Sequence, residues 1–313
     1  MTRKIIIDCD PGIDDAVALT CALFDPRLSV MAITSTAGTV TAEQATSNVC
    51  AIVSTLDPPR YPRIGKATPP ESAAVRNDSF LNGATGLGEL TVGLTQRQHL
   101  PTSEKVIAEL LRQHPDEITL VCLGPLTNLA RLCKRDPGVF ELIDKVVVSG
   151  GACDVAGNAT AVAELNLFLD PIAASDVFAS LTTKSLVPLD VTEKVSFGVD
   201  LLEQIPSQST RAGQLLHQIL PYAFRASHQR LGRELLPLID ATTIASIVEP
   251  ELFEWTDVAG KVETQGDLTC GMSVFDRRLR PEWNVNMEIA ISADFDAVRG
   301  LVRRSLQYAG QQS

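Results

Sequence analysis

The sequence predicts an α/β fold, with an open, mostly parallel sheet flanked by helices on both faces. Short β-branched runs recur along the 313 residues, and each has an apolar centre, as in strands buried on both faces. Longer segments with helical periodicity separate these runs. A βαβα order favours right-handed crossovers between parallel strands, which gives this fold class.

The elements can be assigned in chain order. Strands are expected at 4–8, 28–36, 118–124, 145–151 and 184–190. Helices are expected at 14–26, 43–56, 103–115, 126–137 and 171–181. Stretches rich in Pro and Gly at 57–71 and 82–93 are expected to be long connections beside the functional site.

The chain is expected to form a single domain, residues 1–313, because it contains no internal repeat and no low-complexity linker. A further helical block begins near residue 211. It carries aromatic, His and Arg side chains on neighbouring turns, so the segment 205–235 is a candidate helical lid over the site.

Composition limits the partners and the compartment. The net charge of -11, with no basic patch, argues against nucleic acid and anionic membranes as partners, since both are negatively charged. No apolar run reaches the roughly 18 to 20 residues of a spanning helix. The seven cysteines are scattered without a CxxC pair, and no apolar leader is evident, so we expect free thiols and a cytoplasmic protein.

The segment Ile6–Asp15, IIDCDPGIDD, concentrates acidic residues where a strand should end and a helix begin. Ligand sites of open α/β sheets lie at that edge. Asp14 or Asp15 alone could simply cap the helix. Four carboxylates in one turn, Asp8 and Asp10 included, repel one another unless a cation compensates them. Oxygen ligands favour a hard ion, Ca²⁺ or Mg²⁺.

The segment DCDPGIDDA resembles the N-terminal signature of the inosine-uridine preferring nucleoside hydrolases. Further blocks at 41–49, 123–130, 150–171 and 262–276 continue the resemblance in the family's order. The resemblance implies the nucleoside hydrolase fold with its Rossmann-like core. It also implies Ca²⁺-dependent hydrolysis of the N-glycosidic bond of ribonucleosides to ribose and free base, in a homodimer or homotetramer.

The resemblance also assigns roles to residues. The Ca²⁺ ligands would be Asp10, Asp15, Asp240 and the backbone carbonyl of Leu123, and Asp10 would take the proton of the attacking water. Asp14 would hold the ribose 2′-hydroxyl. The 3′- and 5′-hydroxyls would be held by Asn158, Glu164 and Asn166. Asn166 counts with Asp10 as catalytic, because carboxylates and amides stabilise an oxocarbenium-like sugar.

Three positions depart from the family pattern, and all lie on the base side. Ile239 stands where a His normally precedes the last metal ligand, Thr39 follows Gly38 in place of an Asn, and Asn82 replaces a loop His. We expect Thr39 and Asn82 to contact substrate in their altered form. Tyr222 and His228 of the helical block are candidate replacements for the missing donor, although a His on such a helix can also be merely exposed.

These departures keep a second function open: a ribosyl- or nucleoside-binding protein of the same fold that turns over slowly or not at all. A phosphatase of the haloacid dehalogenase type also begins with a strand ending in DxD, but Pro11-Gly12 directly after Asp10 disfavours it. The sequence leaves open the preferred base, the donor that protonates it, the physiological metal, and the choice between dimer and tetramer.

Overall fold

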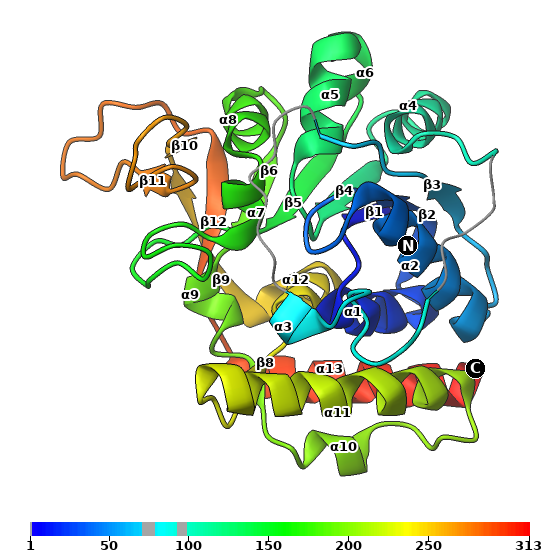
Figure 1. Cartoon of the computed structure of the whole chain (residues 1–313). Helices are drawn as coiled ribbons and strands as arrows, with labels where there is room; N and C mark the ends of the chain where they lie inside the picture. The colour runs from blue at the N-terminus through cyan, green and yellow to red at the C-terminus, as the bar shows by residue number, and fades with distance from the viewer. Residues whose placement is uncertain (1, 71–78, 93–98) are drawn as a thin grey trace.

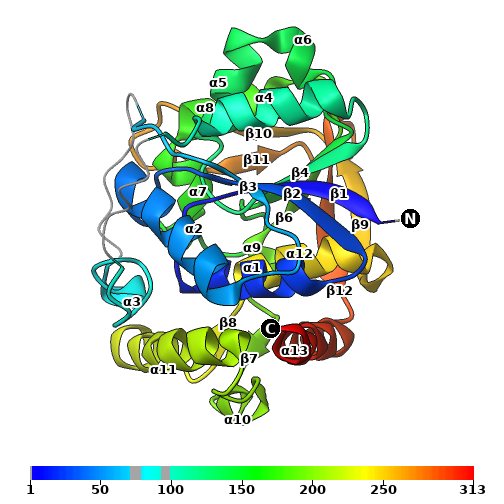
Figure 2. The same cartoon turned by 90° about the vertical axis from the view of Figure 1, so that its right-hand side faces the viewer.

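A computed structural model of the chain describes residues 2–70, 79–92 and 99–313. Its centre is an eight-stranded sheet in the order β3-β2-β1-β4-β5-β6-β12-β9, with helices on both faces (Figures 1 and 2). Neighbouring strands run parallel except β12 and β9, which are antiparallel. The predicted open, mostly parallel α/β fold is therefore confirmed.

The five predicted strands are present, and three strands of the sheet were not predicted. The predicted ones are β1 (Arg3–Cys9), β2 (Leu28–Ser35), β4 (Ile118–Cys122), β5 (Lys145–Ser149) and β6 (Lys184–Val187). The others are β3 (Arg63–Gly65), β9 (Phe253–Val258) and β12 (Met287–Ala293). β3 is short and β9 is a partly exposed edge strand, so neither gives the continuous apolar run of a central strand.

The five predicted helices are also present, and their bounds differ from the predicted ones by at most two residues at either end. They are α1 (Ile13–Phe24), α2 (Ala42–Leu56), α4 (Ser103–Gln113), α5 (Thr127–Arg135) and α8 (Pro171–Ala179). Longer helices follow at α11 (Arg211–Leu231), α12 (Ile239–Val248) and α13 (Phe295–Gln312). The short helices are α3 (Ser79–Asn82), α6 (Pro137–Phe140), α7 (Leu165–Leu169), α9 (Leu189–Thr192), α10 (Leu201–Gln204) and the 3-10 turn η1 (Pro250–Leu252).

Two small antiparallel pairs lie outside the main sheet. One joins β7 (Ser196–Phe197) to β8 (Leu236–Pro237), and the other joins β10 (Gly260–Val262) to β11 (Ser273–Phe275). The predicted long connection at 57–71 contains β3, and the one at 82–93 begins as an ordered loop after α3. Residues 71 and 93 lie outside the part of the chain that the structure describes.

Strand β1 shows why the central strands are apolar throughout. Ile5 and Ile7 are fully buried in the core on one face, which also contains residues of α1, α11, α12 and α13. Ile6 is fully buried in the core on the other face, with residues of α4, α5 and α8. Because side chains alternate along a strand, a sheet covered on both faces favours apolar residues at successive positions.

The candidate lid is largely part of the scaffold. In α11, Leu215, Leu216, Ile219 and Leu220 are all buried in the core. Figure 1 shows the helix lying alongside α13 at one side of the molecule. Its last residues, 228–231, which include His228, are all exposed. A lid function for that end remains a prediction.

Candidate active site

The acidic side chains of the first motif gather with one from the far end of the chain. Asp10 directly follows β1, and Asp14 and Asp15 lie in the first turn of α1. Asp240 lies in the first turn of α12, and its backbone N–H donates to Asp14. Exposed fractions of 2% for Asp10, 4% for Asp15 and 8% for Asp240 show that the group is buried. We call these four residues the acidic cluster.

Two glycines make room for the Asp10 carboxylate. A Cβ added to Gly38 would lie 2.1 Å from one Asp10 oxygen, and a Cβ added to Gly124 would lie 2.3 Å from the other. The backbone N–H of Thr39 donates to Asp10 Oδ2 at 2.5 Å. Backbone atoms of the loops after β2 and β4 therefore pack closely around the Asp10 carboxylate. Thr39 was predicted to contact substrate. Its backbone N–H binds the Asp10 carboxylate, and its contact with substrate stays a prediction.

Hydrogen bonds orient the other three acids but leave two of their oxygens without partners. Asp15 Oδ2 accepts from the N–H of Gly12 at 2.9 Å, and Asp14 Oδ2 accepts from the N–H of Asp240 at 3.1 Å. Asp240 Oδ1 accepts from the Ser149 hydroxyl at 3.0 Å. The Oδ1 atoms of Asp14 and Asp15 are buried and, within the described ranges, have no hydrogen-bond partner. Such atoms are costly unless a ligand satisfies them.

The electrostatics of the cluster call for a positive charge. Burial raises the pKa of Asp10 to about 6 and that of Asp14 to about 7. Burial and repulsion by neighbouring carboxylates raise the pKa values of Asp15 and Asp240 well above their usual range. Within residues 2–70, 79–92 and 99–313, no Lys or Arg forms an ion pair with any of the four. Either protons or a bound cation must therefore compensate the cluster.

The donor atoms of the cluster suit a hard cation, although the side chains do not by themselves form a complete metal site. Among the residues that the structure describes, no three His, Cys, Asp or Glu side chains are arranged to hold a metal ion unaided. The available donors are all oxygens, including the two without partners, and oxygen ligands suit Ca²⁺. The carbonyl of Leu123 accepts a hydrogen bond from Asn166 Nδ2 at 2.8 Å, which leaves one lone pair for an ion.

The predicted sugar-binding residues lie after β5, beside the cluster. Asn166, 8% exposed, donates from Nδ2 to the carbonyls of Leu123 and Ser149, which ties the ends of β4 and β5 together. The Glu164 carboxylate caps α7 by accepting from the N–H groups of Asn166 and Leu167, and burial raises its pKa to about 7. Asn158 is exposed and accepts from the Leu165 N–H at 2.8 Å. Their ribose contacts remain predictions.

The predicted base-side residues are more widely spread. Asn82 Oδ1 accepts from the Ile13 N–H at 3.2 Å. This loop therefore borders residues 10–15, which we call the acidic turn. Tyr222 of α11 packs on Gly88, and the Arg225 guanidinium lies 5.5 Å from the centre of its ring. His228 is exposed near the end of α11. The hydrogen bonds and ion pairs of the described chain join neither Tyr222 nor His228 to the acidic cluster.

Sequence reasoning grouped Asp8 with the cluster and missed its partners. Asp8 lies inside β1 with no exposure, and its Oδ1 accepts from Thr34 at 2.5 Å and from Asn128 at 2.8 Å. Burial raises its pKa to about 7. Asn128 on α5 and Asn48 on α2 are wholly or almost wholly buried amides within helices. A polar residue at an apolar helix position was the signal that could have found both.

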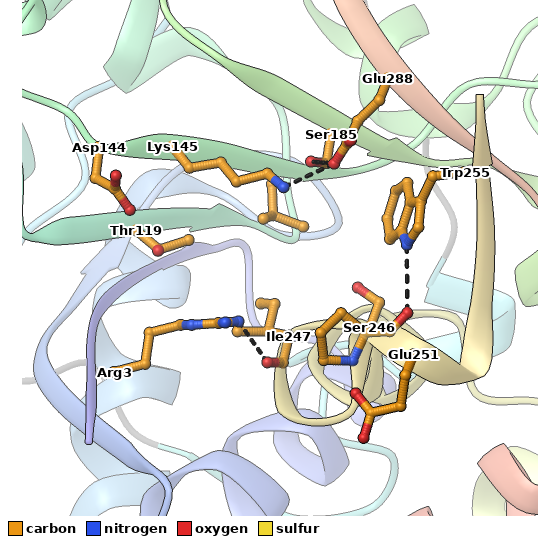
Figure 3. Close-up of a pocket in the computed structure, with 12 residues that line it drawn as sticks. Arg3, Thr119, Asp144, Lys145, Ser185, Ser246, Ile247, Glu251, Trp255 and Glu288 are labelled. Carbon is orange, nitrogen blue, oxygen red and sulfur yellow. Dashed lines mark hydrogen bonds and ion pairs between the residues drawn. The ribbon is translucent and has the colours of Figure 1, made fainter. Parts of the chain in front are cut away.

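A hollow of about 410 Å³ lies at the opposite, amino-terminal edge of the sheet (Figure 3). Within it, Lys145 pairs with Glu288 at 2.7 Å, and Arg3 donates to the carbonyl of Ile247 at 2.5 Å. The indole N–H of Trp255 points to the Pro250 carbonyl at 3.4 Å. These groups satisfy one another, whereas the acidic cluster retains oxygens without partners. The cluster is therefore the candidate active site.

Comparison with known proteins agrees with this geometry. The family model for inosine-uridine preferring nucleoside hydrolases matches residues 5–300. The chain belongs to this family. It is 37% identical over 280 residues to the pyrimidine-specific ribonucleoside hydrolase RihA of Shewanella baltica, with 88% of this chain and 87% of that protein covered. It is 32% identical over 316 residues to the inosine-uridine preferring nucleoside hydrolase of Leishmania major, with 99% of both covered.

The nucleoside hydrolase fold is shared as well. A plant nucleoside hydrolase structure superimposes with a TM-score of 0.91 at 27% identity, covering 98% of this chain and 99% of that one. The predicted nucleoside hydrolase fold is therefore confirmed, as is the predicted enzyme class, a nucleoside N-ribohydrolase. Family membership favours the enzyme over the non-catalytic binding protein. No helix in the described chain is long and apolar enough to cross a membrane.

Proposed function

We propose that this nucleoside hydrolase cleaves the N-glycosidic bond of ribonucleosides to ribose and free base, in a Ca²⁺-dependent reaction with Asp10 as the proton acceptor. One observation carries the proposal. Three buried carboxylates, Asp10, Asp15 and Asp240, and the half-buried Asp14 converge at the carboxyl edge of the sheet, with two partnerless oxygens and, among the described residues, no cationic side chain paired with them. A cation and a polyhydroxylated ligand are what such a site lacks.

The proposed ion ligands are Asp10, Asp15, Asp240 and the carbonyl of Leu123. A bound Ca²⁺ would supply positive charge to the carboxylates and acidify water and hydroxyl groups at the site. Support comes from the partnerless Oδ1 of Asp15 and from the burial and mutual repulsion that raise the pKa values of Asp15 and Asp240. The all-oxygen donor set favours Ca²⁺ over Zn²⁺.

The side chains of the cluster divide the chemistry between them. Asp10, fixed by Thr39 and two glycines, would accept the proton of the attacking water. The partnerless Oδ1 of Asp14 would accept from the ribose 2′-hydroxyl, so 2′-deoxyribonucleosides should react poorly. Asn166 beside Leu123 would stabilise the oxocarbenium-like sugar.

The base side sets the choice among nucleosides. Ile239 opens α12 next to Asp240, and an aliphatic side chain there cannot deliver a proton. Because neither Tyr222 nor His228 is joined to the cluster, we propose that the reaction favours leaving groups that need little protonation. The relatives are named for pyrimidine nucleosides and for inosine and uridine, and we propose the same broad class of ribonucleosides here.

Turnover of a ribonucleoside panel before and after chelation tests the proposal. We expect turnover that chelation abolishes and that Ca²⁺ restores better than Zn²⁺. Asp10→Asn should fold and lose at least ~10³-fold in kcat/KM. Asp144→Asn is the matched control, because Asp144 is exposed at the opposite edge of the sheet. Activity that survives exhaustive chelation contradicts the metal dependence, and ribose binding without any turnover supports the binding-protein alternative.

The compartment and the assembly are proposed on separate grounds. The seven cysteines lie buried or half-buried as thiols, which suits a reducing compartment, and we propose a cytoplasmic enzyme. We also propose a homodimer or homotetramer. Light scattering of the purified enzyme tests the assembly, and a monomeric mass would overturn it.

A further inference from the structure

Asn48 of α2 is a buried amide whose hydrogen bonds join two distant segments. Its side chain is 0% exposed. Nδ2 donates to the carbonyl of Pro11 at 2.9 Å and to the carbonyl of Thr85 at 2.7 Å. Oδ1 accepts from Gln44 Nε2 at 2.9 Å. Both donor hydrogens of the amide are thus committed to backbone carbonyls from two different loops.

The first of these loops is the acidic turn itself. Pro11 directly follows Asp10 and precedes Gly12, whose N–H donates to Asp15. A movement of the Pro11 carbonyl would therefore move the backbone that carries Asp10 and that binds the Asp15 carboxylate. The hydrogen bond from Asn48 holds this carbonyl in place.

The second loop, residues 82–92, borders the cluster, and we call it the wall loop. Asn82 Oδ1 accepts from the Ile13 N–H, at the helix turn that carries Asp14 and Asp15. Gly86 has a φ of +86° and packs closely against Asn48 and its partner carbonyl. A Cβ added to Gly86 would lie 3.0 Å from the Pro11 carbonyl oxygen and 3.1 Å from Asn48 Nδ2. Gln44 reaches the end of the loop by donating to the Val92 carbonyl at 3.3 Å.

The wall loop is also held from its outer side. The Tyr222 ring packs on Gly88, and Arg225 pairs with Glu89. Inside the loop, the Gly88 N–H donates to the Asn82 carbonyl at 2.7 Å. The loop is thus internally braced, and Asn48 joins the braced loop to the acidic turn through its hydrogen bonds to the Thr85 and Pro11 carbonyls.

We propose that Asn48 is a positioning residue that sets the distance between the wall loop and the acidic turn, and thereby the discrimination among nucleosides that differ in their base. The proposal rests on the proposed hydrolysis at the acidic cluster. Asn48 acts through the Pro11 and Thr85 carbonyls and does not itself contact the reacting atoms.

The test compares Asn48→Ala with Asn286→Ala. Asn286 is a matched control, because its Nδ2 also donates to two backbone carbonyls, those of Phe178 and Gly260 at 2.8 and 2.9 Å, beside β10 and β12. The readout is the ratio of kcat/KM for inosine to kcat/KM for uridine. This ratio does not depend on how much of the protein is folded, so a merely structural role would not change it.

A misplacement of about 1 Å can cost ~10²-fold, so we expect Asn48→Ala to lower kcat/KM at least ~10-fold and to change the ratio at least ~5-fold. Asn286→Ala should keep the ratio within ~2-fold of the wild type. An unchanged ratio in Asn48→Ala, or an equal change in Asn286→Ala, overturns the proposal. If Asn48→Ala does not fold, the isosteric Asn48→Asp, which loses both donors, takes its place with the same two outcomes.

Hydrogen exchange separates failure of this proposal from failure of the proposed function. We expect Asn48→Ala to speed amide exchange in both the wall loop and the first turn of α1, and Asn286→Ala to leave both as in the wild type. Unchanged exchange in Asn48→Ala overturns the positioning role. If the wild type hydrolyses no nucleoside, the proposed function fails while the exchange result still decides whether Asn48 couples the two loops.

Discussion

Asp14 on α1 caps α12, because its Oδ2 accepts a hydrogen bond from the backbone N–H of Asp240 at 3.1 Å. The N–H groups of Ile239 and Ala241 also favour the charged form of this carboxylate. Leu238, which precedes α12, offers no side-chain cap of its own. A residue 226 positions away thus supplies the cap, and its other oxygen remains without a partner in the described chain.

This double use of Asp14 predicts that stability and activity can be separated. Asp14→Asn retains a carbonyl oxygen that can accept from the helix and buries no charge, so it should be at least as stable as the wild type. Asp14→Ala also removes the cap, so its free energy of unfolding should be about 1 kcal/mol lower than that of Asp14→Asn, as loss of such a cap commonly costs. Both should lose at least ~10²-fold in kcat/KM, because they lack the charged oxygen that we propose accepts from the ribose 2′-hydroxyl. Urea unfolding and steady-state kinetics measure the two effects. Equal stability of the Ala and Asn variants would contradict the capping role.

The raised pKa values predict a pH-dependent stabilisation by Ca²⁺. In the metal-free protein the pKa is about 6 for Asp10 and about 7 for Asp14, whereas an unfolded Asp titrates near ~3.9. Between those values the folded state binds protons that the unfolded state has lost, so stability falls as pH rises toward 7. Ca²⁺ replaces the protons, and at about 100 times its Kd it should add ~2.7 kcal/mol.

Thermal unfolding with chelator and with excess Ca²⁺ measures this effect. The increase in Tm caused by Ca²⁺ should be larger at about pH 8 than at about pH 5, because at the lower pH the ion must displace protons. Taking the difference between the two conditions at each pH removes the contribution of groups that do not bind the ion. The same increase at both pH values would argue against a cation site at these carboxylates.

The close packing of Gly38 and Gly124 against the Asp10 carboxylate predicts that activity is sensitive to substitution at these glycines. Gly124→Ala places a Cβ 2.3 Å from an Asp10 oxygen, so the carboxylate must move. We expect kcat/KM to fall at least ~10²-fold in a protein that still folds. Gly138→Ala is the control, because an added Cβ there meets nothing within 4 Å. Near-normal activity of Gly124→Ala would show that the position of Asp10 is not critical.

Ile239 predicts a dependence on the leaving group. General acid assistance is worth ~10² to 10⁴-fold, so p-nitrophenyl riboside, which departs as a stable anion, should be cleaved disproportionately well relative to inosine. Ile239→His should raise inosine turnover and leave p-nitrophenyl riboside nearly unchanged. If the wild type hydrolyses inosine as fast as p-nitrophenyl riboside, another donor exists, and Tyr222→Phe and His228→Ala would locate it.

The sequence by itself determined five of the eight strands of the sheet, the acidic turn and the family. Short β-branched runs such as the three isoleucines at 5–7 favour a strand covered on both faces, and chain order then sets the parallel crossovers. The motif IIDCDPGIDD combines a strand end, a turn and a helix start within ten residues. Local geometry was therefore enough to place Asp10, Asp14 and Asp15 together.

Tertiary structure alone decided how the acidic turn is supported. Asp240 meets Asp14 across 226 positions, and Asn48 joins Pro11 to Thr85 across 37 positions on each side. Gly38 and Gly124 matter only because the loops after β2 and β4 converge on the Asp10 carboxylate. Periodicity describes which face of an element is buried. It cannot say which distant backbone carbonyl or N–H lies within hydrogen-bonding distance of a given side chain, because that depends on how separate elements pack.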